Sequence, residues 1–334
     1  MFNSLKKPRL VKSRLAWRWA AIGLGLLICV VGITGWYWSR EPARNFVAFD
    51  NRQRPFVVGY ATVDGIIRTC GWLLEKPGGY LSNDIMLPGV WLDNMPSFEF
   101  GVLEQCRDIS RVLRDRFSRS QSQSTEDLDL AVAQPALNFS NDSWMFPATE
   151  SKIQEALEAL ESYRGRISNT QEPSAQFYAR ADNLNDWLSV VELRLGSLSQ
   201  RLSASVAQTR VNTDLAGEPN ATTSTRRPQY VEVRTPWLQI DDVFYEARGT
   251  AWALLQFLRA IEQDFAGVLE DKNAAISIEQ IVLELEGGLG RVLSPIIFNG
   301  KGFGFFANHS LVLASYLSRA HSAIIDVRDL LEQG

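Results

Sequence analysis

The sequence predicts an all-α protein in which one N-terminal transmembrane helix precedes an elongated helical bundle. Three observations support this fold class. The stretch Trp19–Ser39 carries no charge, and several later segments repeat apolar residues at alternating steps of four and three positions, as helices packed side by side do. In addition, no convincing run of alternating apolar and polar residues predicts a half-buried strand.

The uncharged stretch Trp19–Ser39 is long enough to cross a membrane. As a helix it reaches about 30 Å, which matches one hydrocarbon core. Tryptophans stand at both of its ends, where their amphipathic rings favour the headgroup layer. A cleaved signal peptide has an apolar core of about 7–15 residues that ends in small residues. Because this core is longer and ends in Trp36-Tyr37-Trp38, we expect an uncleaved anchor.

Charge predicts the orientation of this anchor. Only basic charged residues precede the span, and Glu41 is the first acidic residue of the chain. Because short basic flanks stay in the cytoplasm, we expect the N-terminus inside and the C-terminal domain outside.

A stripe of small residues follows one face of the span. It consists of Ala21, Gly25, Cys29 and Gly32. Such a stripe lets two helices approach closely and predicts a dimer seam. Gly and Ala are also common in membrane helices generally, so the stripe is equally read as ordinary composition.

Composition narrows the function classes. The chain has 34 basic and 38 acidic residues, and the six basic residues before the span leave 28 against 38, a net charge of about −10 for the rest. So acidic a domain disfavours binding to nucleic acid or to anionic lipid headgroups. Two histidines and the lack of a Cys-x-x-Cys motif predict no metal site, and no sequence motif predicts a cofactor.

Periodicity and composition divide the chain into segments. The predicted segments are a cytoplasmic basic tail (1–18), the transmembrane helix (19–39), a juxtamembrane linker (40–56), helical region 1 (57–210), a flexible linker (211–234) and helical region 2 (235–334). The clearest helices are predicted over Ile153–Ile167 and Phe177–Leu202, and Ile240–Val268 repeats the heptad-like steps of four and three seen in Phe177–Leu202. The Ser/Gln-rich segment Ser118–Gln134 is expected to be a flexible loop.

Thr62 and Ser97 are predicted to cap the starts of the first two helices. Further helix starts are predicted at Thr235-Pro236, where Pro suits the first turn, and near Asn308. Between the first two of these helices, Tyr80–Pro96 is too apolar for a solvated loop and is expected to pack across the helices.

Two cysteines follow the span, one on the core face of each of the first two predicted helices. If these faces meet, Cys70 and Cys106 are positioned to form a disulfide. If they do not meet, both are small buried hydrophobes.

The segment Phe298–Phe306 has an unusual composition, with alternating glycines and one lysine. It lacks the Gly-x4-Gly-Lys-Ser/Thr spacing of a phosphate-binding loop, and no strand precedes it. One interpretation is a flexible connection that covers a bundle end. The other is a contact for a partner or for the membrane through Phe298, Phe303, Phe305 and Phe306.

Carboxylates in residues 80–104 support an enzyme as the alternative function, acting on a glycan or peptide of the cell envelope. Glycoside hydrolysis requires two carboxyl groups facing each other across about 5–9.5 Å. Glu99 with Glu104, or Asp84 with Asp93, are the candidate pairs. Charged residues on helix faces and turns are usually solvated, so a structural or protein-interaction role is the first prediction.

Three runs resemble a known family. They are Gly71–Asp84 (GWLLEKPGGYLSND), Pro88–Pro96 (PGVWLDNMP) and Ala175–Leu184 (AQFYARADNL). Together they resemble the proteobacterial domain of unknown function 2333 family of single-span inner-membrane proteins. The resemblance implies a Gram-negative inner membrane and a periplasmic bundle, and it carries no activity or catalytic residues. The expected partners are therefore the lipid bilayer, through residues 19–39, and an envelope protein or a second copy of this chain.

Overall fold

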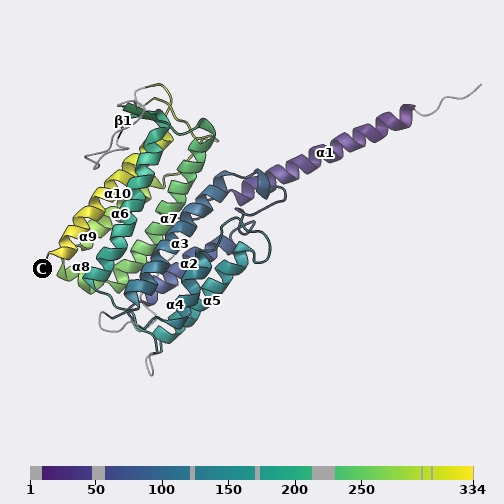
Figure 1. The fold of residues 1–334 in the computed structure, drawn as a ribbon. Coiled ribbons are helices and arrows are strands. Elements are labelled where there is room, and N and C mark those ends of the chain that lie inside the picture. Colours follow the sequence, from purple (N-terminus) through teal and green to yellow (C-terminus); the bar gives the residue numbers. More distant parts are fainter. Residues whose placement is uncertain are drawn as a thin grey trace, which may run out of the picture.

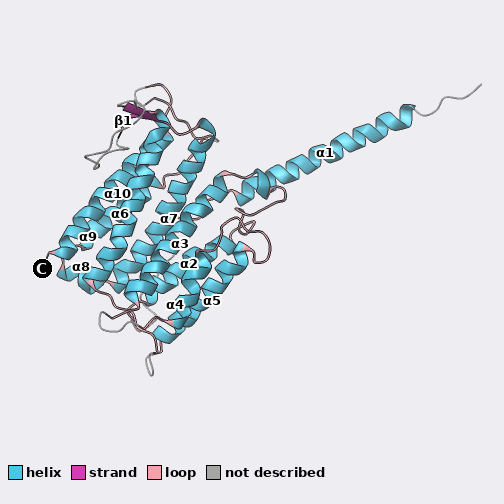
Figure 2. Ribbon diagram, in the orientation of Figure 1, coloured by secondary structure: helices cyan, strands magenta, loops and turns pink. Residues whose placement is uncertain are grey.

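The computed structural model describes residues 10–46, 57–120, 125–169, 174–212, 230–294, 296–301 and 304–333. Helices account for most of this part of the chain, and the two short strands lie together at one end of the bundle (Figure 2). The predicted all-α fold class, with one apolar N-terminal helix, is confirmed.

The helices follow in chain order. They are α1 (Leu10–Trp38), α2 (Tyr60–Glu75), α3 (Asn94–Val112), α4 (Leu128–Leu137), α5 (Thr149–Ile167), α6 (Ala181–Ser203), α7 (Ile240–Asp264), α8 (Ala266–Asp271), α9 (Ala275–Gly288) and α10 (His309–Glu332). Strands β1 (Gln208–Val211) and β2 (Tyr230–Val233) pair antiparallel, with Gln208 opposite Val233.

Helix α1 projects away from the bundle (Figure 1). The part of it that is long and apolar enough to cross a membrane is Ala16–Trp38, and 6% of its most apolar window is buried. Among the residues of α1 whose burial is described, Ala16 to Val30 are all exposed, whereas Gly35 is buried and Val31, Thr34 and Trp38 are half-buried.

The remaining helices share one hydrophobic core on both sides of the 211–234 segment. Helix α7 packs on α3 and α2, α6 packs on α10, α10 on α9, and α4 on α5 (Figure 1). Helix α7 has the broadest buried surface, because apolar residues cover most of its circumference. Helices before and after the predicted linker therefore contact each other directly.

Two glycines allow α3 and α7 to cross with their backbones in contact. A Cβ atom at Gly101 would lie 2.1 Å from the Glu246 carbonyl oxygen, and one at Gly249 would lie 2.0 Å from that of Phe98. Real Cβ atoms do not approach so closely, so both positions need glycine.

One sequence expectation is wrong. The end of the predicted loop Ser118–Gln134 belongs to α4, whose apolar residues pack on α5 and whose N-terminus is capped by Asp127. Strand β2 lies within the C-terminal end of the predicted linker 211–234, whereas β1 overlaps that linker only at Val211, and residues 213–229 lie outside the described residues. Both strands are too short to show a clear alternation.

The predicted helix starts agree with the structure at some positions and are shifted by a few residues at others. Asn308 does cap α10, because its side chain accepts a hydrogen bond from the Leu311 amide. Helix α2 begins before Thr62, at Tyr60, and α3 begins before Ser97 because Asp93 supplies its cap. After Pro236 one turn of 3₁₀ helix precedes α7.

Candidate functional site

The main candidate site is the junction where α1 joins the bundle. The segment Glu41–Phe46, part of the predicted linker, runs along α7 and is bonded to it. Arg248 Nε donates to Glu41 Oε1 at 2.8 Å, and Trp252 Nε1 donates to the Ala43 carbonyl oxygen at 2.9 Å. The Phe46 ring lies 5.5 Å from that of Trp252.

Two further α7 side chains continue this contact. Gln256 Nε2 and Arg259 Nη1 both donate to the Arg44 carbonyl oxygen, at 2.9 and 2.8 Å. Arg248, with a side chain only 3% exposed, also donates to the Gly290 carbonyl oxygen after α9. A charged side chain so deeply buried needs partners on every side, and Glu41 supplies the opposite charge. The described half of the juxtamembrane linker is therefore fixed to the bundle.

The last turn of α1 is held by close packing. A Cβ atom at Gly35 would lie 3.5 Å from the side chains of Pro88 and Leu92, which is ordinary van der Waals contact. Gly78, at φ 89°, lies against the Trp38 ring, and a Cβ atom there would come within 2.6 Å of it. The Arg40 guanidinium lies 4.3 Å from the centre of the Trp36 ring.

A buried ion pair fixes the loop that contacts α1. Lys76 Nζ lies 2.7 Å from Glu99 Oε1, and the two side chains are 1% and 0% exposed. Glu99 also accepts hydrogen bonds from the amides of Leu81 and Ser82, at 3.0 and 2.9 Å. Burial raises the pKa of Glu99, while Lys76 and these donors oppose the rise. The pair ties the end of α2 to α3 and sets the path of Tyr80–Pro96.

Three of the four carboxylates considered for catalysis, Glu99, Glu104 and Asp93, have structural partners. Glu99 is sealed from solvent, so it does not flank an open cleft with Glu104, which pairs with Arg194 at 2.8 Å. Asp93 accepts from the Asn94 amide at the start of α3. Burial and the nearby Glu150 raise the pKa of Asp84. The geometry gives the enzyme alternative no support.

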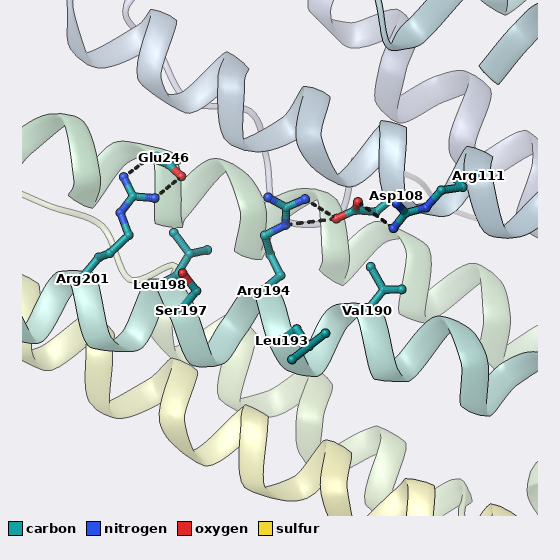
Figure 3. A pocket seen from close by; sticks show the side chains of 9 residues that line it. All are labelled: Asp108, Arg111, Val190, Leu193, Arg194, Ser197, Leu198, Arg201 and Glu246. Atoms are coloured by element: carbon teal, nitrogen blue, oxygen red, sulfur yellow. Dashed lines mark hydrogen bonds and ion pairs between the residues drawn. The ribbon is translucent and has the colours of Figure 1, made fainter. Parts of the chain in front are cut away.

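The second candidate site is a hollow of about 350 Å³ between α3, α6 and α7 (Figure 3). Arg194 Nη2 lies 2.6 Å from Asp108 Oδ2, and Arg201 makes two 2.6 Å bonds to Glu246. Arg111 approaches the other oxygen of Asp108 at 3.6 Å. Each guanidinium lies beside a carboxylate, and Asp108 is shared by Arg111 and Arg194, so these pairs connect α6 to α3 and α7.

The structure brings Cys70 and Cys106 together. They form a disulfide between α2 and α3, with Cα atoms 6.2 Å apart and both residues fully buried. It lies in the same core as the Lys76–Glu99 pair.

The other predicted contact residues lie at the surface. Phe305 and Phe306 are exposed, Phe298 stacks on Phe306 with ring centres 6.2 Å apart, and Phe303 lies outside the described residues. The small-residue stripe on α1 (Ala21, Gly25, Cys29 and Gly32) is exposed throughout, and nothing lies within 4 Å of a Cβ atom built at either glycine.

Sequence reasoning missed the residues that hold Glu41–Phe46. Arg248 and Gln256 could have been recognised as contact residues, because both interrupt the apolar surface of the helix predicted over Ile240–Val268. A long polar side chain on a buried face needs a specific partner, and here that partner is the chain after α1.

Among the described residues, no group of three or more His, Cys, Asp or Glu side chains is arranged to hold a metal ion.

Comparison with known proteins places the chain in a family. No curated protein and no solved structure matches it. One family profile matches residues 11–334, nearly the whole chain, and confirms the resemblance of the three runs. The chain therefore belongs to the domain of unknown function 2333 family (DUF2333), described as an uncharacterized protein conserved in bacteria.

Proposed function

We propose that this chain is a single-pass protein of the bacterial inner membrane. Its helical bundle lies in the periplasm, where it is a structural or protein-interaction component of the cell envelope. The observation that carries the proposal is the junction: an exposed apolar helix of membrane-spanning length is fixed to a folded bundle through Glu41–Phe46.

The junction favours an anchor over a cleaved signal peptide. Cleavage after the apolar stretch would separate α1 from the contacts that its last turn makes with Pro88, Leu92 and Gly78. A sequence destined for removal has no need of such contacts. The basic residues before the span support a cytoplasmic N-terminus.

Several features support an interaction role over an enzymatic one. Asp93 caps α3, Glu104 pairs with Arg194, and Glu99 is sealed in the core with Lys76. Exposed aromatic residues on the loop before α10 offer a surface for an envelope protein, and the small-residue stripe of α1 offers one for a second copy.

Topology is tested with reporters fused after Gly334. A phosphatase active only outside the cytoplasm should be active there, whereas green fluorescent protein exported by the same route should stay dark. The protein should also resist carbonate extraction and keep its full mass. A fluorescent, phosphatase-inactive fusion contradicts the orientation, and a soluble product shortened near Trp38 contradicts the anchor.

The interaction role is tested by photocrosslinking in intact cells. A photoreactive residue at Phe305 should give one defined adduct, identified by mass spectrometry as an envelope protein or a second copy. The same residue at Leu128, an apolar position on α4 that is 83% exposed, is the control. Identical adduct patterns at both positions, or none at either, count against a partner at this loop.

A further inference from the structure

The segment Ile85–Trp91 presents a patch of large apolar side chains to the outside. The exposed members are Ile85, Met86, Leu87, Val90 and Trp91. A contiguous apolar patch of this kind normally marks a surface that is covered in the working protein.

The inner side of the same segment packs on α1. Pro88 is buried, and Pro88 and Leu92 contact the helix at Gly35. Gly35 lies inside the apolar stretch Ala16–Trp38, three residues before its end, which corresponds to about 4.5 Å along the helix axis. Along the axis of α1, the segment therefore lies at the same height as the last turn of the helix (Figure 1).

We propose that Ile85–Trp91 inserts into the headgroup layer of the bilayer that α1 crosses. This inference rests on the proposed function, because it takes α1 as the span. The 23 residues of Ala16–Trp38 reach about 35 Å, slightly more than a hydrocarbon core of about 30 Å. Gly35 then lies at the edge of the hydrocarbon, and side chains packed beside it lie at headgroup depth.

The chemistry of the patch fits this layer. Trp91 has the amphipathic ring that favours the membrane interface, as do Trp36 and Tyr37 near the end of α1, and all three are exposed. Because Pro88 and Leu92 contact α1 at Gly35, the patch lies beside the surface of the span, which argues for lipid as its occupant.

The loop is held in shape at both ends. Glu99 accepts hydrogen bonds from Leu81 and Ser82 at its start, and Asp93 caps α3 at its end. Val90, Trp91 and Leu92 also donate backbone hydrogen bonds within the loop. Insertion therefore needs no folding of the segment on the membrane, and the bundle gains a second contact with the bilayer beside α1.

The experiment places single fluorescent labels on the full-length chain. Cysteine is introduced at Met86, at Leu193 or at Leu26 in a Cys29→Ser background, since Cys70 and Cys106 are bonded and buried. Met86 and Leu193 are both 75% exposed, so Leu193, on α6, is a matched control, while Leu26 reports on α1. Each protein is reconstituted in phosphatidylethanolamine–phosphatidylglycerol vesicles that carry nitroxides on the headgroup or at mid-chain.

The expected result is quenching of the Met86 label by headgroup nitroxides, with a several-fold lower rate of quenching by aqueous iodide than at Leu193. The Leu26 label should be quenched by mid-chain nitroxides. If Met86 behaves like Leu193 while Leu26 is quenched, the insertion is overturned and the anchor stands. If Leu26 is not quenched, both fail. A Met86 label shielded from nitroxide and iodide alike means that a second copy covers the patch, which also overturns the proposal.

Discussion

Replacing Gly249 with alanine should separate α7 from α3. The new Cβ atom would lie 2.0 Å from the Phe98 carbonyl oxygen, whereas ordinary contacts begin at 3.4 Å, so the helices must move apart by about 1.4 Å. The obstructing atom belongs to a backbone, which cannot rotate aside. Overpacking of a core costs about 1–3 kcal/mol, and we expect the upper end. Alanine returns up to about 1 kcal/mol through its higher helix propensity, which leaves a net loss of about 2 kcal/mol.

The assay is thermal unfolding of the full-length protein in nanodiscs. Near-ultraviolet circular dichroism follows the core aromatic cluster, in which the Trp72 and Trp252 ring centres are 5.0 Å apart. For the 278 residues from 57 to 334 the entropy of unfolding is about 0.6 kcal/mol/K, so a loss of 2 kcal/mol should lower Tm by about 3 °C. Gly165→Ala is the matched control, because Gly165 is an exposed helical glycine with nothing within 4 Å of its Cβ position. The Gly165→Ala protein should have the Tm of the wild type or a higher one. If the Gly249→Ala protein unfolds at the same Tm as Gly165→Ala, the backbone contact is refuted.

Two further changes test the core beside the junction. Cys106→Ser opens the link to Cys70, 36 residues away, and should cost about 3–4 kcal/mol through the loss of loop closure, measured by the same unfolding assay; equal melting of oxidised and reduced wild type would contradict it. Lys76→Met leaves the Glu99 carboxylate buried without its partner and should cost about 3–5 kcal/mol. The control Lys152→Met removes an exposed ion pair and should change the free energy of unfolding by less than about 1 kcal/mol. Similar losses in the two variants would show that burial does not increase the cost of removing Lys76.

Apolar periodicity located most of the bundle. The heptad-like runs Phe177–Leu202 and Ile240–Val268 contain α6 and α7, and the cap at Asn308 begins α10. These signals are local: a helix repeats its buried face every three or four residues whatever it packs against. The same periodicity placed Cys70 and Cys106 each on a predicted core face, and the packing of α2 on α3 is what brings the two together.

The junction was beyond such reasoning because its contacts are distant in sequence. Arg248 and Glu41 are 207 residues apart, and irregular backbone such as Glu41–Phe46 has no period that identifies a partner. Helix α4 was missed for a related reason. Its acidic residues suggested solvation, yet Asp127 caps the helix and Asp129 pairs with Arg166 of α5 at 2.6 Å. Those roles depend on a neighbouring helix.

The bonded path from α1 to α7 has a mechanical consequence. Without a free joint at Glu41–Phe46, a change in the tilt of α1 turns the bundle as the long arm of a lever. Glu41 meets α7 at Arg248, and the 16 residues from there to Asp264 span about 24 Å, so a tilt of about 10° displaces that end by roughly 4 Å. Bilayer thickness alters helix tilt. A small change in the tilt of α1 therefore moves the far end of the bundle far enough to make or break a contact there.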